Sequence, residues 1–299
     1  MKKFLCWLLV LTLCGLVPAA LGEEEDGHGT VEVLQIDAES DEPFTAAPSL
    51  PTETESLDAA DIEANQSIST ESGLNIVLSD DDVSYSIFGK DNRATIKNTR
   101  KYPYSAIAHM VIKGECGCTW DGTGFMVSSH ALVTAAQNLV CSDHSTWAEN
   151  INFYFGFSNL QNYMYSYTGT WTAYVGTTFP DHRYSADYDY GFVRFYKEVG
   201  NQTGWFGMSF MGDKEISNTL LHVAGYQQYK LKHDSGFAEA VNSRLIQYKM
   251  DTTYGCAGGP VYTSDGYAVG IDIATNSSGN YGYRLTYALY QKMCELGIY

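Results

Sequence analysis

Short runs of β-branched, aromatic and other apolar residues, each ended by Gly, Asn, Asp or Ser, fill the chain from Ile87 onward. Some runs alternate apolar and polar residues and others are wholly apolar, as strands in barrels and sandwiches do. Tyrosine, which favours strands, occurs 23 times. We therefore predict an all-β fold. The runs read "SAIAHMVI", "TGFMVSS", "ALVTAA", "INFYFGF", "YGFVRFY", "LLHVAGY", "GPVYTS" and "YAVGIDI".

The end of the chain departs from this strand pattern. In "TYALYQKMCELGIY", Leu289, Met293 and Leu296 recur at the spacing of one helix face. We expect one C-terminal helix there. No internal repeat of fixed period is visible in the sequence.

Charge divides the chain at Ser86. Residues 23–86 hold 18 of the 35 acidic residues and no Lys or Arg, so they account for nearly all of the formal net charge of −17. This composition, poor in aromatics, predicts a disordered acidic pro-segment or linker. Residues 87–299 hold the remaining 17 acidic residues and 16 basic residues, because two of the 18 bases are Lys2 and Lys3. A near-neutral globular domain offers no basic face for nucleic acid.

The first 22 residues predict export. "MKKFLCWLLVLTLCGLVPAALG" has two lysines, an apolar run and then small residues, which is the pattern of a signal peptide cleaved before Glu23. Cys14 offers a lipoprotein alternative, but Leu13 stands where a lipid-modified cysteine needs a small residue. No later apolar run is long enough to span a bilayer. We expect a secreted, extracellular protein with no membrane contact after signal removal.

Cysteine usage leaves two interpretations open. Five cysteines follow the signal peptide, an odd number that leaves at least one free thiol. Export favours a disulfide between Cys141 and Cys116 or Cys118. A metal site at Cys116-Gly-Cys118 is the competing interpretation, but a second ligand pair at metal spacing is lacking. We therefore predict neither a metal nor a cofactor. The five are Cys116, Cys118, Cys141, Cys256 and Cys294.

Three separated segments resemble the catalytic segments of the trypsin-like (chymotrypsin-fold) serine proteases, specifically the glutamyl endopeptidase branch. Serine peptidases need an activated hydroxyl, an imidazole base, a carboxylate that orients it, and backbone N–H donors for the oxyanion. "GTGFMVSSHALVTAAQNL" resembles the base segment, "DYDYGFVRF" the segment with the orienting aspartate, and "MDTTYGCAGGPVY" the nucleophile loop.

Three further motifs extend the resemblance over residues 87–299. "FGKDNRATIKNTRKYPYSAI" is similar to the mature start of glutamyl endopeptidases, and "TGWFGMSF" and "NYGYRLT" also have counterparts in the family order. The resemblance implies two antiparallel six-stranded β-barrels with a cleft between them. We expect a monomer.

Two of the three catalytic positions depart from the family. Gln137 stands at the base position, and a carboxamide cannot accept and return a proton near neutral pH. Ala257 stands at the nucleophile position. Asp189 matches the orienting aspartate, and its "Asp-Tyr-Gly-apolar" context favours it over Asp187. Losing such groups costs on the order of 10⁶ in kcat, so we predict an inactive homologue.

The resemblance also assigns backbone and pocket positions. The N–H groups of Gly255 and Ala257 match the oxyanion hole, although the glycines of this loop fit equally well as turn residues that only retain the fold. In the specificity pocket, Thr252 matches a family threonine, but Asp272 replaces the histidine that receives the substrate's glutamate. Repulsion between carboxylates disfavours acidic side chains. Tyr254 replaces a family glycine, and we expect it to narrow the pocket.

A relocated catalytic pair is the alternative to inactivity. Cys256 neighbours the nucleophile position, and His144 lies seven residues beyond Gln137. A shift of one residue in a tight turn points the side chain elsewhere, which disfavours this pair. We expect His109 and His130 to be structural.

The leading hypothesis is a secreted, inactive homologue that binds a peptide or protein in the cleft. An active serine- or cysteine-type endopeptidase with a relocated group is the runner-up. Engineered silencing of an active protease is disfavoured by the retained signal peptide and by the additional departures at Tyr254 and Asp272.

Overall fold

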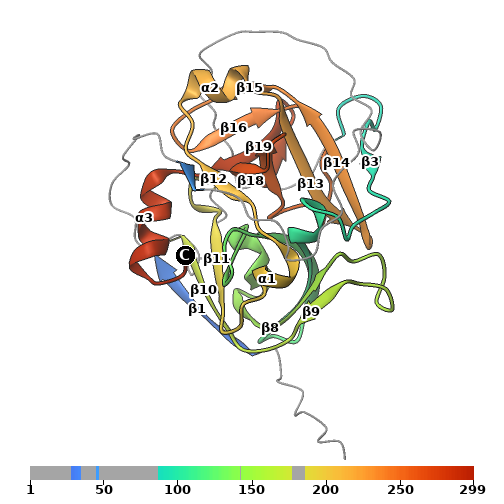
Figure 1. Ribbon diagram of the computed structural model, residues 1–299, viewed down its shortest axis with the longest axis vertical. Helices are drawn as coiled ribbons and strands as arrows, with labels where there is room; N and C mark the ends of the chain where they lie inside the picture. The colour runs from blue at the N-terminus through green and yellow to red at the C-terminus, as the bar shows by residue number, and fades with distance from the viewer. Residues whose placement is uncertain (1–27, 35–44, 47–86, 142, 177–185) are drawn as a thin grey trace, which may run out of the picture.

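The chain folds into two curled β-sheets with few helices, which confirms the predicted all-β class (Figure 1). The predicted signal peptide lies outside the described residues, as does most of the acidic segment. In the described part of the chain, no helix is long and apolar enough to cross a membrane. The computed structural model describes residues 28–34, 45–46, 87–141, 143–176 and 186–299.

The first sheet has nine strands. They are β1 (Gly29–Leu34), β4 (Ile107–Gly114), β5 (Thr119–Met126), β6 (Ala131–Thr134), β7 (Val140–Cys141), β8 (Thr146–Phe155), β9 (Tyr165–Tyr167), β10 (Trp171–Gly176) and β11 (Gly191–Phe195). Their hydrogen-bonded order is β1-β10-β11-β6-β5-β4-β8-β7, with β9 paired to β8. Aromatic rings fill its interior: Phe195 lies with its ring centroid 4.8 Å from that of Phe153 and 4.7 Å from that of Tyr167.

The second sheet has ten strands. They are β2 (Thr45–Ala46), β3 (Ala94–Thr95), β12 (Gly207–Ser209), β13 (Leu221–Gln227), β14 (Lys230–Gly236), β15 (Ala238–Val241), β16 (Leu245–Tyr248), β17 (Pro260–Thr263), β18 (Tyr267–Asn276) and β19 (Gly279–Arg284). Their order is β15-β16-β19-β18-β17-β13-β14-β3, with β12 joining β18 to β2. Both sheets have more strands than the six expected for each barrel, because each includes additional short strands.

Helical segments are short, and the predicted C-terminal helix is confirmed as α3 (Tyr287–Glu295). Thr286 caps it, because its Oγ1 accepts a hydrogen bond from the N–H of Leu289 at 3.3 Å. Leu289 and Met293 face the core, as their spacing predicts, and Leu296 is the C-cap. The other segments are α1 (Gly200–Thr203), α2 (Asp213–Asn218) and the 3₁₀ turns η2 (Tyr104–Ala106), η3 (Ala136–Asn138) and η4 (Ala186–Tyr188).

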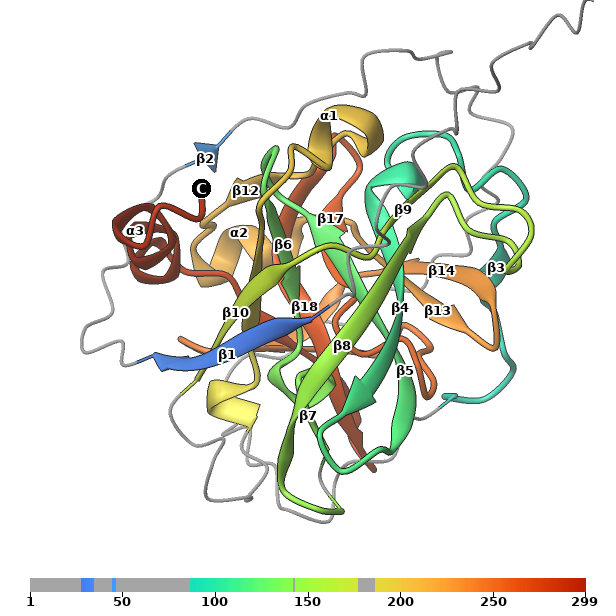
Figure 2. The ribbon, with the colours of Figure 1, turned by 90° about the horizontal axis from the view of Figure 1, so that it is seen from below.

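Two parts of the acidic segment, β1 and β2, are strands, which corrects the expectation that residues 23–86 are disordered throughout. Strand β1 pairs in parallel with β10 at the edge of the first sheet (Figure 2). Val31 packs against the main core, and the backbone of Gly29 lies against the ring of Trp171. The short run "GTVEVL" has strand propensity that the acidic composition around it conceals.

Replacing Gly29 with alanine should detach β1, because a Cβ at this position would overlap the buried ring of Trp171. We expect a loss of about 1–3 kcal/mol in the free energy of unfolding and faster amide exchange in β1 and β10. Thr30→Ala, at the adjacent exposed position, is the control. Unchanged exchange in Gly29→Ala would mean that β1 does not depend on this contact.

Candidate active site

The fold brings the three catalytic positions to one place between the two sheets. Gln137 lies in η3, and its backbone N–H and its Nε2 donate to the two carboxylate oxygens of Asp189 at 2.9 and 2.8 Å. Nε2 also donates to the carbonyl oxygen of Ile273 at 2.6 Å. Asp189 is fully buried, and a buried carboxylate needs such donors. Asp189 therefore orients the carboxamide of Gln137.

The loop that carries Ala257 is fixed to the first sheet by hydrogen bonds. Thr123 in β5 donates its hydroxyl to the carbonyl of Gly255 at 2.7 Å and its N–H to the carbonyl of Ala257 at 3.0 Å. Asn138 Nδ2 also donates to the Ala257 carbonyl, at 2.8 Å. Gly255 and Gly258 adopt φ values of 91° and 86°, which side chains disfavour. The loop is therefore rigid without a catalytic serine.

Two N–H groups of this loop are left without an acceptor. Cys256 donates its N–H to the Thr253 carbonyl at 2.9 Å, and Gly258 donates to the Asp272 carbonyl at 2.7 Å. By contrast, the N–H groups of Gly255 and Ala257 have no acceptor among the described residues. A substrate carbonyl oxygen is the group that such donors serve in an oxyanion hole. Their convergence on one point stays a prediction.

The expected pocket residues are buried, with unsatisfied polar atoms. Thr252 is 1% exposed, and its Oγ1 has no partner among the described residues. Asp272 is fully buried; its Oδ1 accepts the Tyr248 hydroxyl at 2.6 Å, whereas its Oδ2 has no partner in the described part. Burial raises the pKa of Asp272 to about 7, the Tyr248 hydrogen bond opposes this, and Asp189 adds to it. Two buried polar atoms beside the loop thus have no hydrogen-bond partner in the described part of the chain.

Tyr254 does not fill this pocket. Its side chain is 69% exposed, so the ring is not packed among the buried residues around Asp272. That Tyr254 narrows the pocket entrance stays a prediction. The residue lies in the turn before Gly255, and the ring points to solvent because no neighbouring element covers it. The pocket's chemistry therefore depends on Thr252 and Asp272.

The relocated Cys256–His144 pair is not assembled. Cys256 is 3% exposed, and burial raises the pKa of its thiol to about 11, which keeps it protonated and unreactive. His144 lies elsewhere, with its Nδ1 3.4 Å from the Cys118 sulfur. His109 is buried, and its ring stacks on Phe157 with centroids 4.7 Å apart. His130 is half-buried, with Nδ1 2.9 Å from the Ser129 hydroxyl.

Sequence reasoning missed Thr123, Asn138 and the carbonyl of Ile273. The sequence holds no local signal for them, because their hydrogen bonds join residues from different sheets. Only the fold brings β5, η3 and β18 together around the loop.

Comparison with known proteins agrees with this geometry. Residues 122–271 match the family model described as a trypsin-like peptidase domain. This match spans half of the chain, so the protein belongs to the trypsin-like peptidase family. It is 32% identical over 219 residues to the "Extracellular metalloprotease" of Bacillus subtilis (strain 168), covering 67% of this chain and 66% of that one. It is 26% identical over 206 residues to the "Glutamyl endopeptidase" of Bacillus licheniformis, covering 66% of this chain and 62% of that one.

The chain therefore spans slightly less than two thirds of the length of both relatives. Among solved structures, a Glu endopeptidase in complex with MPD matches with a TM-score of 0.59 at 20% identity, over 71% of this chain and 99% of that one. Protease Anisep from Arthrobacter nicotinovorans matches with a TM-score of 0.53 at 18% identity, over 67% and 97%. These likenesses confirm the predicted fold.

Asp272→Asn should change how stability depends on pH. The folded protein keeps a proton on Asp272 up to about pH 7, whereas the ordinary pKa is 3.8. The unfolded chain loses that proton first, so the free energy of unfolding falls as pH rises from about 4 to about 7, by as much as about 4 kcal/mol. The uncharged variant should lack this fall. Denaturant titrations across pH 4–8 measure it, with exposed Asp187→Asn as the control; equal profiles for Asp272→Asn and the unaltered protein would contradict it.

Proposed function

We propose that this protein is an exported, monomeric member of the trypsin-like peptidase family that has lost hydrolysis and binds a peptide or protein segment in its cleft. One observation carries the proposal: Gln137 occupies the base position with Nε2 donating to both Asp189 and Ile273, while Ala257 has no hydroxyl. The predicted signal peptide supports export, as does the relative from Bacillus subtilis that is named as extracellular.

The lost chemistry follows from proton transfer. Acyl transfer needs a group that takes the nucleophile's proton and returns it to the leaving amine. The Nε2 of Gln137 can only donate, and both of its acceptors are fixed main-chain or carboxylate oxygens. A serine restored at position 257 alone would therefore stay unactivated.

The retained groups support binding of an extended backbone. Strand β17 pairs with β18 no further than Ile271, opposite Pro260. The main chain of Asp272 bonds to Gly258 and Gly259, and the Ile273 carbonyl accepts from Gln137. Beyond them, 274–276 has a strand neighbour on one side only, which is β19. A peptide that adds to such an edge gains main-chain hydrogen bonds. The N–H groups of Gly255 and Ala257 would hold one of its carbonyls.

A peptide cannot reach this strand edge without a movement of the protein. Ile273, Ala274 and Thr275 are all fully buried, so a peptide reaches the edge only after the chain packed on these residues moves. We therefore expect slow association.

The pocket atoms support a preference for side chains that donate hydrogen bonds. Thr252 Oγ1 and Asp272 Oδ2 are acceptors without a partner among the described residues. An amide or cationic side chain satisfies them, whereas a glutamate carboxylate meets a second carboxylate. Since the pKa of Asp272 is about 7, attraction for a cation should grow as pH rises from 6 to 8.

One arrangement outside the cleft favours a second candidate, an active serine hydrolase. Ser264, exposed in the turn between β17 and β18, has its Oγ 2.8 Å from His222 Nε2. His222 Nδ1 lies 3.1 Å from His233 Nε2, so a nucleophile, a base and an orienting group are in contact. Both imidazoles are kept neutral, because burial lowers their pKa values. We rank it second, because the group that contacts His222 Nδ1 is another neutral imidazole and not a carboxylate.

Activity measurements test the loss of hydrolysis. We expect no labelling by a fluorophosphonate probe and no cleavage of a mixed peptide library. Gln137→His alone and Ala257→Ser alone should stay inactive, whereas the double variant should gain measurable cleavage because Asp189 already orients position 137. Labelling of the unaltered protein that Ser264→Ala abolishes would establish the second candidate instead.

Peptide binding tests the retained cleft. We expect peptides that differ only in one side chain to bind in the order Arg, Gln, then Glu, with Arg binding more tightly at pH 8 than at pH 6. Asp272→Asn should remove that pH dependence, and Asp272→His should shift the preference toward Glu. Tyr254→Gly is the control, since its ring is exposed. Calorimetry that detects no binding for any variant would mean that the function lies on another surface.

A further inference from the structure

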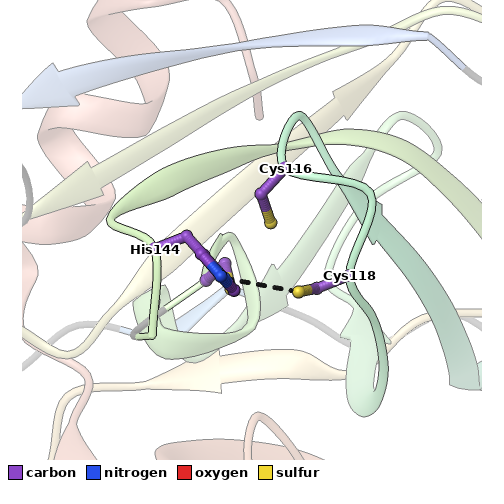
Figure 3. A group of neighbouring side chains, drawn as sticks. Cys116, Cys118 and His144 are labelled. Carbon is purple, nitrogen blue, oxygen red and sulfur yellow. Dashed lines mark hydrogen bonds between the residues drawn. The ribbon is translucent and has the colours of Figure 1, made fainter.

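Three cysteines and one histidine meet at one end of the first sheet, away from the catalytic positions. The three sulfur atoms of Cys116, Cys118 and Cys141 and one ring nitrogen of His144 all lie within 4.8 Å of one another. Figure 3 shows the side chains of Cys116, Cys118 and His144 pointing toward a common centre. All five cysteines in the described part of the chain are free thiols, so the expected disulfide is not formed.

Two neighbouring hairpins supply the four groups. The turn between β4 and β5 carries Cys116 and Cys118; Cys141 ends β7, and His144 lies in the turn between β7 and β8. Strand β8 joins the hairpins because it pairs with both β4 and β7. The second ligand pair, which the sequence spacing around Cys116-Gly-Cys118 did not reveal, is thus provided by the fold.

The distances fit a tetrahedral metal site. Zinc–sulfur bonds of about 2.3 Å and zinc–nitrogen bonds of about 2.0–2.1 Å place nitrogen and sulfur ligands about 3.6 Å apart around a tetrahedron. His144 Nδ1 lies 3.4 Å from the Cys118 sulfur and 3.6 Å from the Cys141 sulfur. A disulfide requires two sulfurs at about 2.05 Å and would use only two of the four groups.

We propose that Cys116, Cys118, Cys141 and His144 bind one structural Zn²⁺ ion. Three thiolates and an imidazole are the ligand set that zinc prefers over calcium or magnesium, which take oxygen ligands. Four protein ligands close the coordination sphere, so the metal offers no open position for a catalytic water. The site is independent of whether the cleft binds a peptide.

Backbone hydrogen bonds hold both ligand pairs in place. In the first turn, Gly114 donates its N–H to the Cys118 carbonyl at 2.9 Å, and Gly117 donates to the Gly114 carbonyl at 2.8 Å. In the second, Ser145 donates to the Cys141 carbonyl at 2.7 Å. These bonds fix the ligands' main chain before a metal arrives, which reduces the ordering cost of binding.

The site adjoins the segment that carries Gln137. Strand β7 directly follows η3, and Trp120, two residues after Cys118, donates its Nε1–H to the Asn138 carbonyl at 3.1 Å. Asn138 in turn donates to the carbonyl of Ala257. A metal that joins the two hairpins therefore stabilises one wall of the cleft.

Metal analysis of the purified, full-length secreted protein tests the proposal. We expect about one zinc ion per chain, no loss of zinc in Cys294→Ser, and loss of bound zinc in Cys118→Ser and His144→Ala. Cys294 is an exposed cysteine of α3 outside the cluster, which makes its variant the matched control. Removal of zinc by a chelator should lower the melting temperature, and added Zn²⁺ but not Mg²⁺ should restore it.

Cobalt substitution keeps the test decisive if the ligand variants fail to fold. Co²⁺ added to the metal-free unaltered protein should give thiolate charge-transfer and tetrahedral d–d absorption, which Zn²⁺ then removes. The proposal is overturned if the fully reduced protein gives neither these bands nor a change in melting temperature with Zn²⁺. It is also overturned if mass analysis of the secreted protein finds a disulfide among Cys116, Cys118 and Cys141 in place of bound zinc.

Discussion

The cleft depends on the hydrogen bonds by which the first sheet holds the loop before β17. Thr123 and Asn138 bind the carbonyls of Gly255 and Ala257, all in buried surroundings where an unmade bond would be costly. This contact fixes the two sheets relative to each other. It uses main-chain carbonyls of the loop, so it needs no side chain at position 257.

The cost of leaving a buried polar atom without a hydrogen bond also explains why the fold persists with Gln137 at the base position. Buried Asp189 needs two donors, and Gln137 supplies both, one from its main chain and one from its side chain. A carboxamide therefore satisfies the carboxylate without the ability to accept a proton in return. Asp272 is the contrasting case, because one of its oxygens has no partner in the described part and burial raises its pKa.

The edges of the first sheet carry features that a peptidase fold does not require. Strand β1 covers one edge through the backbone of Gly29 and the ring of Trp171. At another place the β4–β5 and β7–β8 hairpins bring three cysteines and a histidine together. Both features add contacts at the periphery of the first sheet.

The sequence by itself determined the all-β class and the C-terminal helix at Leu289 and Met293. It also predicted Gln137, Asp189 and Ala257 as the catalytic positions. These depend on local periodicity and on motifs in a fixed order, which a linear pattern records. Tertiary structure alone decided that Gln137 donates to Asp189 and Ile273 and that Tyr254 faces solvent. It also decided that "GTVEVL" is a strand, although the acidic composition around it predicted disorder. Tertiary structure also decided that His144 lies beside Cys116 and Cys118. The register of the strands brings these distant residues together, and the spacing of residues along the chain does not encode their distance in space.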